Sequence, residues 1–252
     1  MIPVASFSYN GGKFSVVNED SICFPSGSFI CVWNTANGRK DFIVPPNYGF
    51  SAVTANYTKG YIAACEHKLR PDVYIYRYTS TNAGGRTEVV DKFPAETTIQ
   101  CVDMHLTRDC SRLLMVGSKP DFKLSVYDLN EKRMLTVDKK LRDRAHIKAE
   151  FDPANDEVFA VMGQHQLMLY RIHRAYQVRE EGGQDVIDES ERVSECDYEL
   201  DPGNRFFTFV WDQYSKIFAS TAAATVVMID GNTGREESVF QLEHPARSIV
   251  LT

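Results

Sequence analysis

Three consecutive residues, Cys65, Glu66 and His67, are of the types that hydrolases and metal sites use. A cysteine becomes a nucleophile when a histidine takes its proton, and both side chains can also ligate zinc. A Cys-His hydrolase, however, needs the two side chains to converge in space, which adjacency in the sequence does not provide. A structural zinc site needs about four ligands, and the nearest further candidates, Cys101 and His105, leave that set incomplete. The favoured interpretation is that Cys65 ends a buried strand and that the following residues form a bend.

Short motifs for nucleotide, calcium or acyl-transfer chemistry are absent from the chain. It has no GxxxxGK[ST], no GxGxxG after a predicted strand, no D-x-[DN]-x-[DN]-G loop and no GxSxG. No two carboxylates of the acidic stretch near residue 190 have a reason to be held as the acid/base pair of a glycosidase. We therefore predict a protein that is not an enzyme and that needs no cofactor and no metal.

The composition is that of a globular protein, with 252 residues of which 43% are hydrophobic and 25% are charged. No apolar run is long enough for a membrane helix, and the first residues lack the regions of a secretory signal. The six cysteines are scattered without a CxxC pair, which indicates reduced thiols in the cytoplasm. The glycosylation sequon at Asn56 is then expected to stay unmodified.

The net charge of −6 is unevenly distributed. The stretch from Glu180 to Asp201 holds ten acidic residues and one basic residue, Arg192, so that the rest of the chain is mildly basic. Because the stretch is rich in acidic residues, Gly and Ser and poor in aromatic residues, we predict a flexible insertion between repeats at about 178–203. The mild positive charge elsewhere suits an acidic protein partner but is too small for a nucleic-acid binder.

Short apolar runs such as "FICVW", "VYIYRY" and "LSVYDL" alternate with turn sequences such as "NTANG", "DPAND" and "DGNTG". Long helical periodicity is absent, so this pattern predicts an all-β chain built from hairpins. In "VYIYRY", Val73 and Ile75 would face one side, and Tyr74, Tyr76 and Tyr78 the other. Apolar residues on both faces predict sheets that are stacked on both sides.

One strand type recurs at a longer interval. Aligning Trp33, Tyr76, Tyr127, Tyr170 and Ile229 gives spacings of 43, 51, 43 and 59 residues. The shorter spacings are those of a WD-type propeller blade of about 40–45 residues. The longer spacings contain insertions, "TSTNAGGR" in one and the acidic stretch in the other. The Trp-Asp signature is approximate, as in "VWN", "VYD" and "MID".

These features predict a WD-type β-propeller of about five blades. The final "RSIVLT" is expected to open a further blade, which makes residues 1–252 an incomplete N-terminal propeller from a longer chain. Closure by a partner chain is the alternative for the missing part. A β-sandwich or another all-β repeat is the alternative fold.

The segment "FSVVNEDSICFPSGSFICVWN", the strand "PDVYIYRY" after the bend "CEHKLRP", and "SKPDFKLSVYDL" resemble the N-terminal propeller of a known family. These are the WD-repeat cilia- and flagella-associated proteins of the axonemal tether and tether head. The likeness is clearest from Phe14 to about Leu129, and the acidic stretch does not match.

The resemblance implies a large axonemal protein with N-terminal propellers and a coiled-coil C-terminal part. It implies a scaffold that helps to tether inner-arm dynein heads to the doublet microtubule in a cilium or flagellum. The implied partners are other tether proteins, the inner-arm dynein heavy chain and tubulin, with no nucleic acid and no membrane. The family supplies no catalytic residues. A WD-repeat subunit of intraflagellar transport or of a coat is the alternative, and a propeller enzyme is the least favoured one.

Two sets of charged residues are candidates for contacts with partners. Lys68, Arg70 and Lys119 lie on equivalent bends of successive repeats and are expected on one rim, where they would face an acidic partner. An acidic docking loop for a basic partner is the second candidate, with Glu180, Glu181, Asp185 and Glu189. For both sets the alternative is an ordinary solvated loop.

Overall fold

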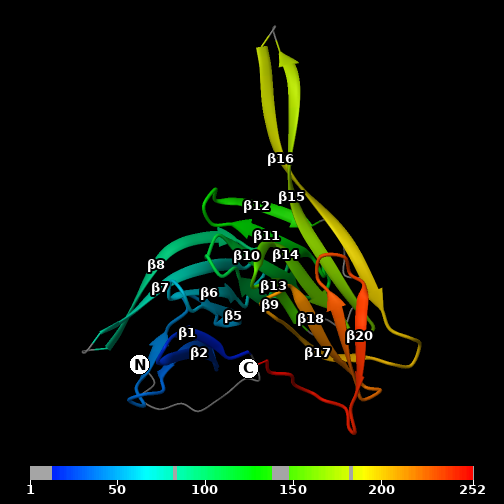
Figure 1. The fold of residues 1–252 in the computed structure, drawn as a ribbon. Coiled ribbons are helices and arrows are strands. Elements are labelled where there is room, and N and C mark those ends of the chain that lie inside the picture. Colours follow the sequence, from blue (N-terminus) through cyan, green and yellow to red (C-terminus); the bar gives the residue numbers. More distant parts are fainter. Residues whose placement is uncertain (1–12, 82–83, 138–147, 182–183, 252) are drawn as a thin grey trace. The chain divides into compact units, whose positions relative to one another are not determined.

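The computed structural model describes the backbone of residues 13–81, 84–137, 148–181 and 184–251, and the side chains of these residues outside 174–195. The chain divides into two compact units, unit 1 over Met1–Leu141 and unit 2 over Arg142–Thr252. The described residues contain no helix, so none of them forms a membrane-spanning helix. Their strands form five four-stranded sheets (Figure 1). The all-β class and the five repeats predicted from the sequence are confirmed.

In each sheet the strands follow one another in chain order, and neighbouring strands pair antiparallel, as in the blade of a WD-type propeller. Unit 1 holds blades 1 to 3. Blade 1 consists of β1 (Ser15–Asn18), β2 (Ser21–Ser26), β3 (Phe29–Asn34) and β4 (Lys40–Ile43). Blade 2 consists of β5 (Phe50–Asn56), β6 (Tyr61–Glu66), β7 (Asp72–Thr81) and β8 (Gly84–Pro94). Blade 3 consists of β9 (Cys101–Leu106), β10 (Arg112–Gly117), β11 (Leu124–Asp128) and β12 (Arg133–Val137).

Unit 2 holds blades 4 and 5. Blade 4 consists of β13 (Lys148–Asp152), β14 (Asn155–Met162), β15 (Gln166–Glu181) and β16 (Gln184–Glu199). Blade 5 consists of β17 (Phe206–Trp211), β18 (Lys216–Thr221), β19 (Thr225–Asp230) and β20 (Glu236–Gln241).

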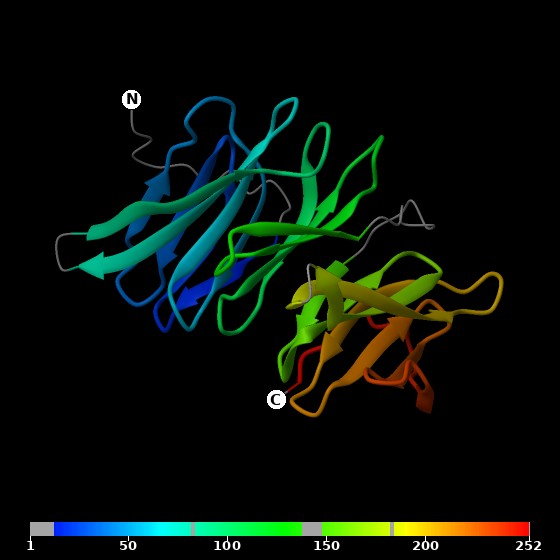
Figure 2. The same cartoon turned by 90° about the horizontal axis from the view of Figure 1, so that it is seen from above.

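The sheet of blade 2 is buried on both faces, as Figure 2 shows for the three stacked sheets of unit 1. Val73 and Ile75 of β7 pack in the core shared with blade 3. Tyr74, Tyr76 and Tyr78 pack in the core shared with blade 1. Because side chains alternate between the faces of a strand, this apolar pattern needs a neighbour on each side. The two-faced burial predicted from the sequence is confirmed here.

Blades 4 and 5 share a core of their own in unit 2. Leu167 and Leu169 of β15 pack there against Phe209 and Trp211 of β17 and Ile229 of β19. Burying a side chain of this size contributes about 1.5–3 kcal/mol. The stacked sheets are therefore held together mainly by apolar contacts between blades.

The residue that follows the recurring aromatic or apolar position determines how the third strand of each blade ends. In blades 1, 3 and 5 this residue is Asn34, Asp128 or Asp230, whose Oδ1 accepts backbone N–H groups two or three residues further on, at 2.8–3.0 Å. Short acceptors of this kind stabilise a tight turn. In blades 2 and 4 the equivalent residue is Arg77 or Arg171, which has no acceptor group. There the strand continues into a long hairpin.

The two long hairpins account for the two long spacings of the repeat. β7 and β8 have 10 and 11 residues, and β15 and β16 have 16 residues each. The pairing of β14 with β15 stops at Arg171, whereas β15 and β16 stay paired out to Glu181 and Gln184. The outer part of this hairpin is therefore a two-stranded ribbon, which Figure 1 shows in yellow-green beyond the end of β14.

A flexible loop between repeats was predicted at about 178–203. The stretch instead contributes the outer part of β15 and all of β16, so it lies inside blade 4. The composition of this stretch shows that it can bury little apolar surface. It does not show that the antiparallel pairing of β15 with β16, which begins in the inner part of the blade, continues into these polar residues. The strand predicted at "RSIVLT" is not found, and residues 242–251 form no strand at all. A strand needs a hydrogen-bonded neighbour, and the described residues offer none there.

Candidate functional site

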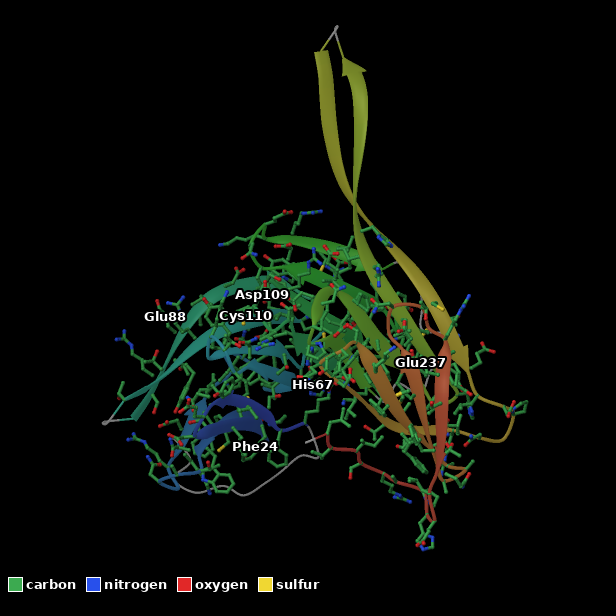
Figure 3. All side chains as sticks on the ribbon, viewed as in Figure 1. Phe24, His67, Glu88, Asp109, Cys110 and Glu237 are labelled. Atoms are coloured by element: carbon green, nitrogen blue, oxygen red, sulfur yellow. The ribbon has the colours of Figure 1, made fainter. Side chains whose placement is uncertain are left out.

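The Cys65-Glu66-His67 stretch does not assemble a reactive centre. Cys65 is fully buried in the core between blades 2 and 3, whereas His67 is exposed in the bend after β6, where Figure 3 labels it. The thiol of Cys65 hydrogen-bonds to that of Cys101, and this contact together with burial raises the pKa of Cys101 well above its usual value. Within the described part of the chain, no three His, Cys, Asp or Glu residues are placed to hold a metal ion.

Glu66 is the unusual member of the three, because its carboxylate has no exposed surface. Its Oε2 lies 2.5 Å from the Nζ of Lys68 and accepts the backbone N–H of Asp72 at 3.3 Å. Its Oε1 is buried and has no hydrogen-bond partner among the described residues. A buried carboxylate is strongly unfavourable unless a cation lies beside it. Lys68 is thus the counterion of Glu66.

The ammonium of Lys68 has a second partner in Asp72. Its Nζ is 3.0 Å from Oδ2 of Asp72, and the Nζ of Lys92 lies 3.1 Å from the same oxygen. The hydrogen bonds with Glu66 and then with Asp72 raise the pKa of Lys68 above its usual value. Lys68 therefore belongs to an internal ion network that closes the bend between β6 and β7.

The two bends that carry the predicted basic residues are joined through a third segment, residues 95–100. The backbone N–H of Arg70 donates to the carbonyl O of Thr98 at 2.8 Å. The N–H of Thr98 donates to Oδ2 of Asp121 at 2.5 Å. A further bond of 2.9 Å runs from the N–H of Ser118 to the carbonyl O of Gln100. Within unit 1, the two bends are therefore neighbours, and a contact surface on them stays a prediction.

The two Pro-Asp pairs of these bends are less alike than the sequence suggests. Asp72 is the first residue of β7, whereas β11 begins three residues after Asp121. Phe122 has a positive φ of 46° and donates its N–H to the carbonyl O of Ser118, which closes an extra turn. The carboxylate of Asp121 is thereby directed to Thr98 rather than to a lysine.

The outer surface of this rim carries both cations and apolar groups. Arg70 and Lys119 are exposed, and no ion pair is found for either among the described residues. Leu69 has 74% of its surface exposed, Ile99 has 36%, and Pro120 is exposed as well. Leu69 and Ile99 were not among the residues predicted from the sequence. A leucine between Lys68 and Arg70 in a predicted bend was the available signal.

The opposite rim of unit 1 is built differently. Asn56 is buried at the end of β5, and its Nδ2 donates to the carbonyl O of Thr107 at 2.7 Å and of Arg108 at 2.9 Å. The side chain of the sequon residue thus joins blades 2 and 3. Lys59 and Arg108 are exposed on this rim, in the turns before β6 and after β9.

The four predicted acidic residues lie in unit 2, in the two-stranded part of the β15–β16 hairpin. Glu180 is paired with Asp185, Glu181 with Gln184, and Glu189 with Tyr176. They therefore share one hairpin but belong to a different unit from Lys68, Arg70 and Lys119.

No family model matches the chain. The chain is similar to the cilia- and flagella-associated protein 43 of Xenopus laevis, with 22% identity over 163 residues. The match covers 65% of this chain and 10% of the frog protein, so the chain spans a small part of that relative. The resemblance seen in the sequence was nearer to protein 43 than to its relative protein 44, and the comparison confirms a distant relationship to protein 43.

Proposed function

We propose that the chain is part of a non-catalytic interaction scaffold of the ciliary or flagellar axoneme. In this role it helps to tether inner-arm dynein heads to the doublet microtubule. Its partners are the inner-arm dynein heavy chain, tubulin of the doublet and other tether proteins. The observation that carries the proposal is the similarity to cilia- and flagella-associated protein 43, on a fold of matching blade type.

The architecture supports a scaffold role. The faces of the sheets are buried between blades, so the loops and hairpins remain exposed for contacts with partner proteins. The side chains that could be reactive have structural roles instead, since Cys65 is buried and Glu66 is neutralised by Lys68. Loops held by a rigid scaffold are the usual place for binding residues. The two candidate surfaces are the rim of unit 1 and the acidic hairpin β15–β16.

The acidic hairpin is proposed as a contact for a basic partner. Beyond Arg171 the edge of β15 that faces away from β16 has no strand partner among the described residues, and the stretch from Glu180 to Asp201 holds ten acidic residues against one basic residue. Attraction between such a stretch and a basic surface accelerates association and weakens as the salt concentration rises.

The proposal is tested by following the full-length protein, tagged in a ciliated cell, through axoneme preparation. We expect it to stay with demembranated axonemes and to cross-link to an inner-arm dynein heavy chain. Recovery in the detergent-soluble fraction together with transport or coat complexes would favour the alternative of a scaffold from another assembly. Recovery outside cilia altogether would refute the proposal.

A further inference from the structure

We propose that the rim formed by Leu69, Arg70, Ile99, Lys119 and Pro120 binds an acidic peptide segment that carries an apolar side chain. We call this surface the Arg70–Lys119 rim. The inference rests on the proposed function only in taking the chain to be a binding scaffold, and it names the kind of partner that this surface fits.

The geometry of the rim is fixed from within. Hydrogen bonds through Thr98 connect the bend of Arg70 with that of Asp121, over distances of 2.8 and 2.5 Å. The N–H of Ala95 also donates to the carbonyl O of Pro71 at 2.8 Å. A surface held in this way loses little conformational entropy when a ligand binds. Three loops thus present one pre-organised surface.

The charges near this surface are mostly paired within the chain. Lys68 and Lys92 neutralise Glu66 and Asp72, and Lys123 pairs with Glu96 at 2.5 Å. The carboxylate of Asp121 is turned inward and accepts the N–H of Thr98. Arg70 and Lys119 have no ion-pair partner within the described chain. Their positive charge is available to a carboxylate from outside, and such charge-assisted hydrogen bonds are the stronger kind.

The exposed apolar residues of the rim indicate which class of partner it binds. Leu69 exposes 74% of its surface on the same loop as Arg70, and Ile99 is adjacent to Thr98, through which both bends are connected. A nucleic-acid backbone would satisfy the two cations but would leave these apolar groups uncovered, and no aromatic residue of the rim offers a base a stacking surface. A peptide with carboxylates around one apolar residue satisfies both.

The backbone conformation of Arg70 is an unfavourable one for an arginine. Its φ of 51° lies in the left-handed region, which is unfavourable for a residue with a long side chain. Glycine or asparagine would adopt this conformation at lower cost. No ion pair within the described structure offsets this cost at Arg70, and the conformation leaves its guanidinium exposed.

The test measures fluorescence anisotropy of a labelled glutamate-rich peptide containing one leucine as it binds the 252-residue chain. The variant Arg70→Gln/Lys119→Gln should weaken binding about tenfold, as the loss of two charge-assisted contacts predicts. Leu69→Ser, or a peptide with serine in place of leucine, should weaken it severalfold. The matched control Lys59→Gln/Arg108→Gln removes two cations from the opposite rim and should bind like the wild type.

Equal loss in the two double variants would overturn the inference, because binding would then follow net charge alone. Absence of binding to the wild type, or equal binding of a single-stranded RNA of similar length, would overturn it as well. Unchanged melting temperatures exclude unfolding as a cause. Peptide binding by a protein that is absent from axonemes would leave this inference standing and refute the proposed function. An axonemal protein that ignores the peptide would do the reverse.

Discussion

The Nζ of Lys68 lies 2.5 Å from Oε2 of Glu66, whose carboxylate is completely buried at the end of β6. A lysine that the sequence places in a surface bend is therefore a structural counterion. Its neighbour Arg70, two residues further on, has its side chain exposed and without an ion pair among the described residues. The two cations of one bend should therefore respond differently to substitution.

Replacing Lys68 by Met should destabilise the fold by about 2 kcal/mol, because it leaves the buried carboxylate of Glu66 without a cation. Urea unfolding followed by circular dichroism measures the loss. The double variant Glu66→Gln/Lys68→Met should recover a large part of it, since no buried charge remains. Lys59→Met, at an exposed lysine, is the control. A Lys68→Met variant as stable as this control would contradict the counterion role.

Replacing Tyr76 or Tyr127 by Asp should cost about 3 kcal/mol or more, because each substitution places an unpaired charge between stacked sheets. Tyr76 is 5% exposed, and Tyr127 stacks on Phe93 with ring centroids 3.5 Å apart. Thermal unfolding measures the effect. Tyr214→Asp, at an exposed tyrosine of a turn, should melt like the wild type. Unaltered melting of Tyr76→Asp would show that the face of β7 towards blade 1 is not buried.

Asp230 should make stability depend on pH in the acid range. Hydrogen bonding from Lys216 lowers the pKa of Asp230 from its usual value of 3.8 to about 2. A carboxyl group whose pKa is lower in the folded state stabilises above the unfolded pKa, and the stabilisation is lost as the pH falls through the folded value. Because the group is only partly buried and solvent screens its charge, we expect a contribution of about 1 kcal/mol at neutral pH.

Comparing the wild type with Asp230→Asn tests this dependence. The difference in unfolding free energy should be constant above about pH 5 and should shrink towards pH 2. A difference that grows on acidification would have the wrong sign and would refute the assignment. Asp212→Asn, at an acidic residue of another turn in blade 5, provides a comparison for general effects of charge.

Removing the outer ribbon of blade 4 should leave the rest of unit 2 folded. β14 pairs with β15 only as far as Arg171, so the backbone pairing of the inner blade does not use the ribbon. Replacing residues 174–191 by Asn-Gly, between the paired residues His173 and Arg192, provides a two-residue hairpin turn. We expect a change of less than about 1 kcal/mol, because an isolated two-stranded ribbon is marginally stable. Loss of cooperative unfolding would show that the ribbon supports the blade.

The fold could be predicted largely from local sequence patterns. Val73, Tyr74, Ile75 and Tyr76 alternate without a polar face, and this is visible in the sequence because the period of a strand is two. The spacings of 51 and 59 residues correctly marked two insertions. The hairpin form of the acidic stretch was not predictable from composition, since its pairing extends a ladder that begins at Gln166.

The repeat brought the two bends of the candidate site together, but the contacts within the site could not be predicted. That Arg70 and Lys119 share a rim followed from the repeat, because equivalent loops of stacked blades lie together. Glu66 lies on the face of β6 that also carries Ile62 and Ala64, and its burial arises only when blade 2 packs against its neighbours, so the sequence could not separate Lys68 from Arg70. Thr98, which joins the two bends, lies in a segment with no recognisable motif, and only the folded chain brings it between them.

The alternation of Asn34, Arg77, Asp128, Arg171 and Asp230 at the ends of the third strands has a practical consequence for engineering. In blades with a capping carboxylate or amide, the third strand ends in a tight turn at this residue. In blades with arginine, the third and fourth strands continue into a longer hairpin. The outer ends of the β7–β8 and β15–β16 hairpins are thus natural insertion points for a fluorescent reporter or an affinity tag. Within unit 1, the outer end of the β7–β8 hairpin lies at the other end of β7 from Asp72, so a label there would leave the Arg70–Lys119 rim accessible to its ligand.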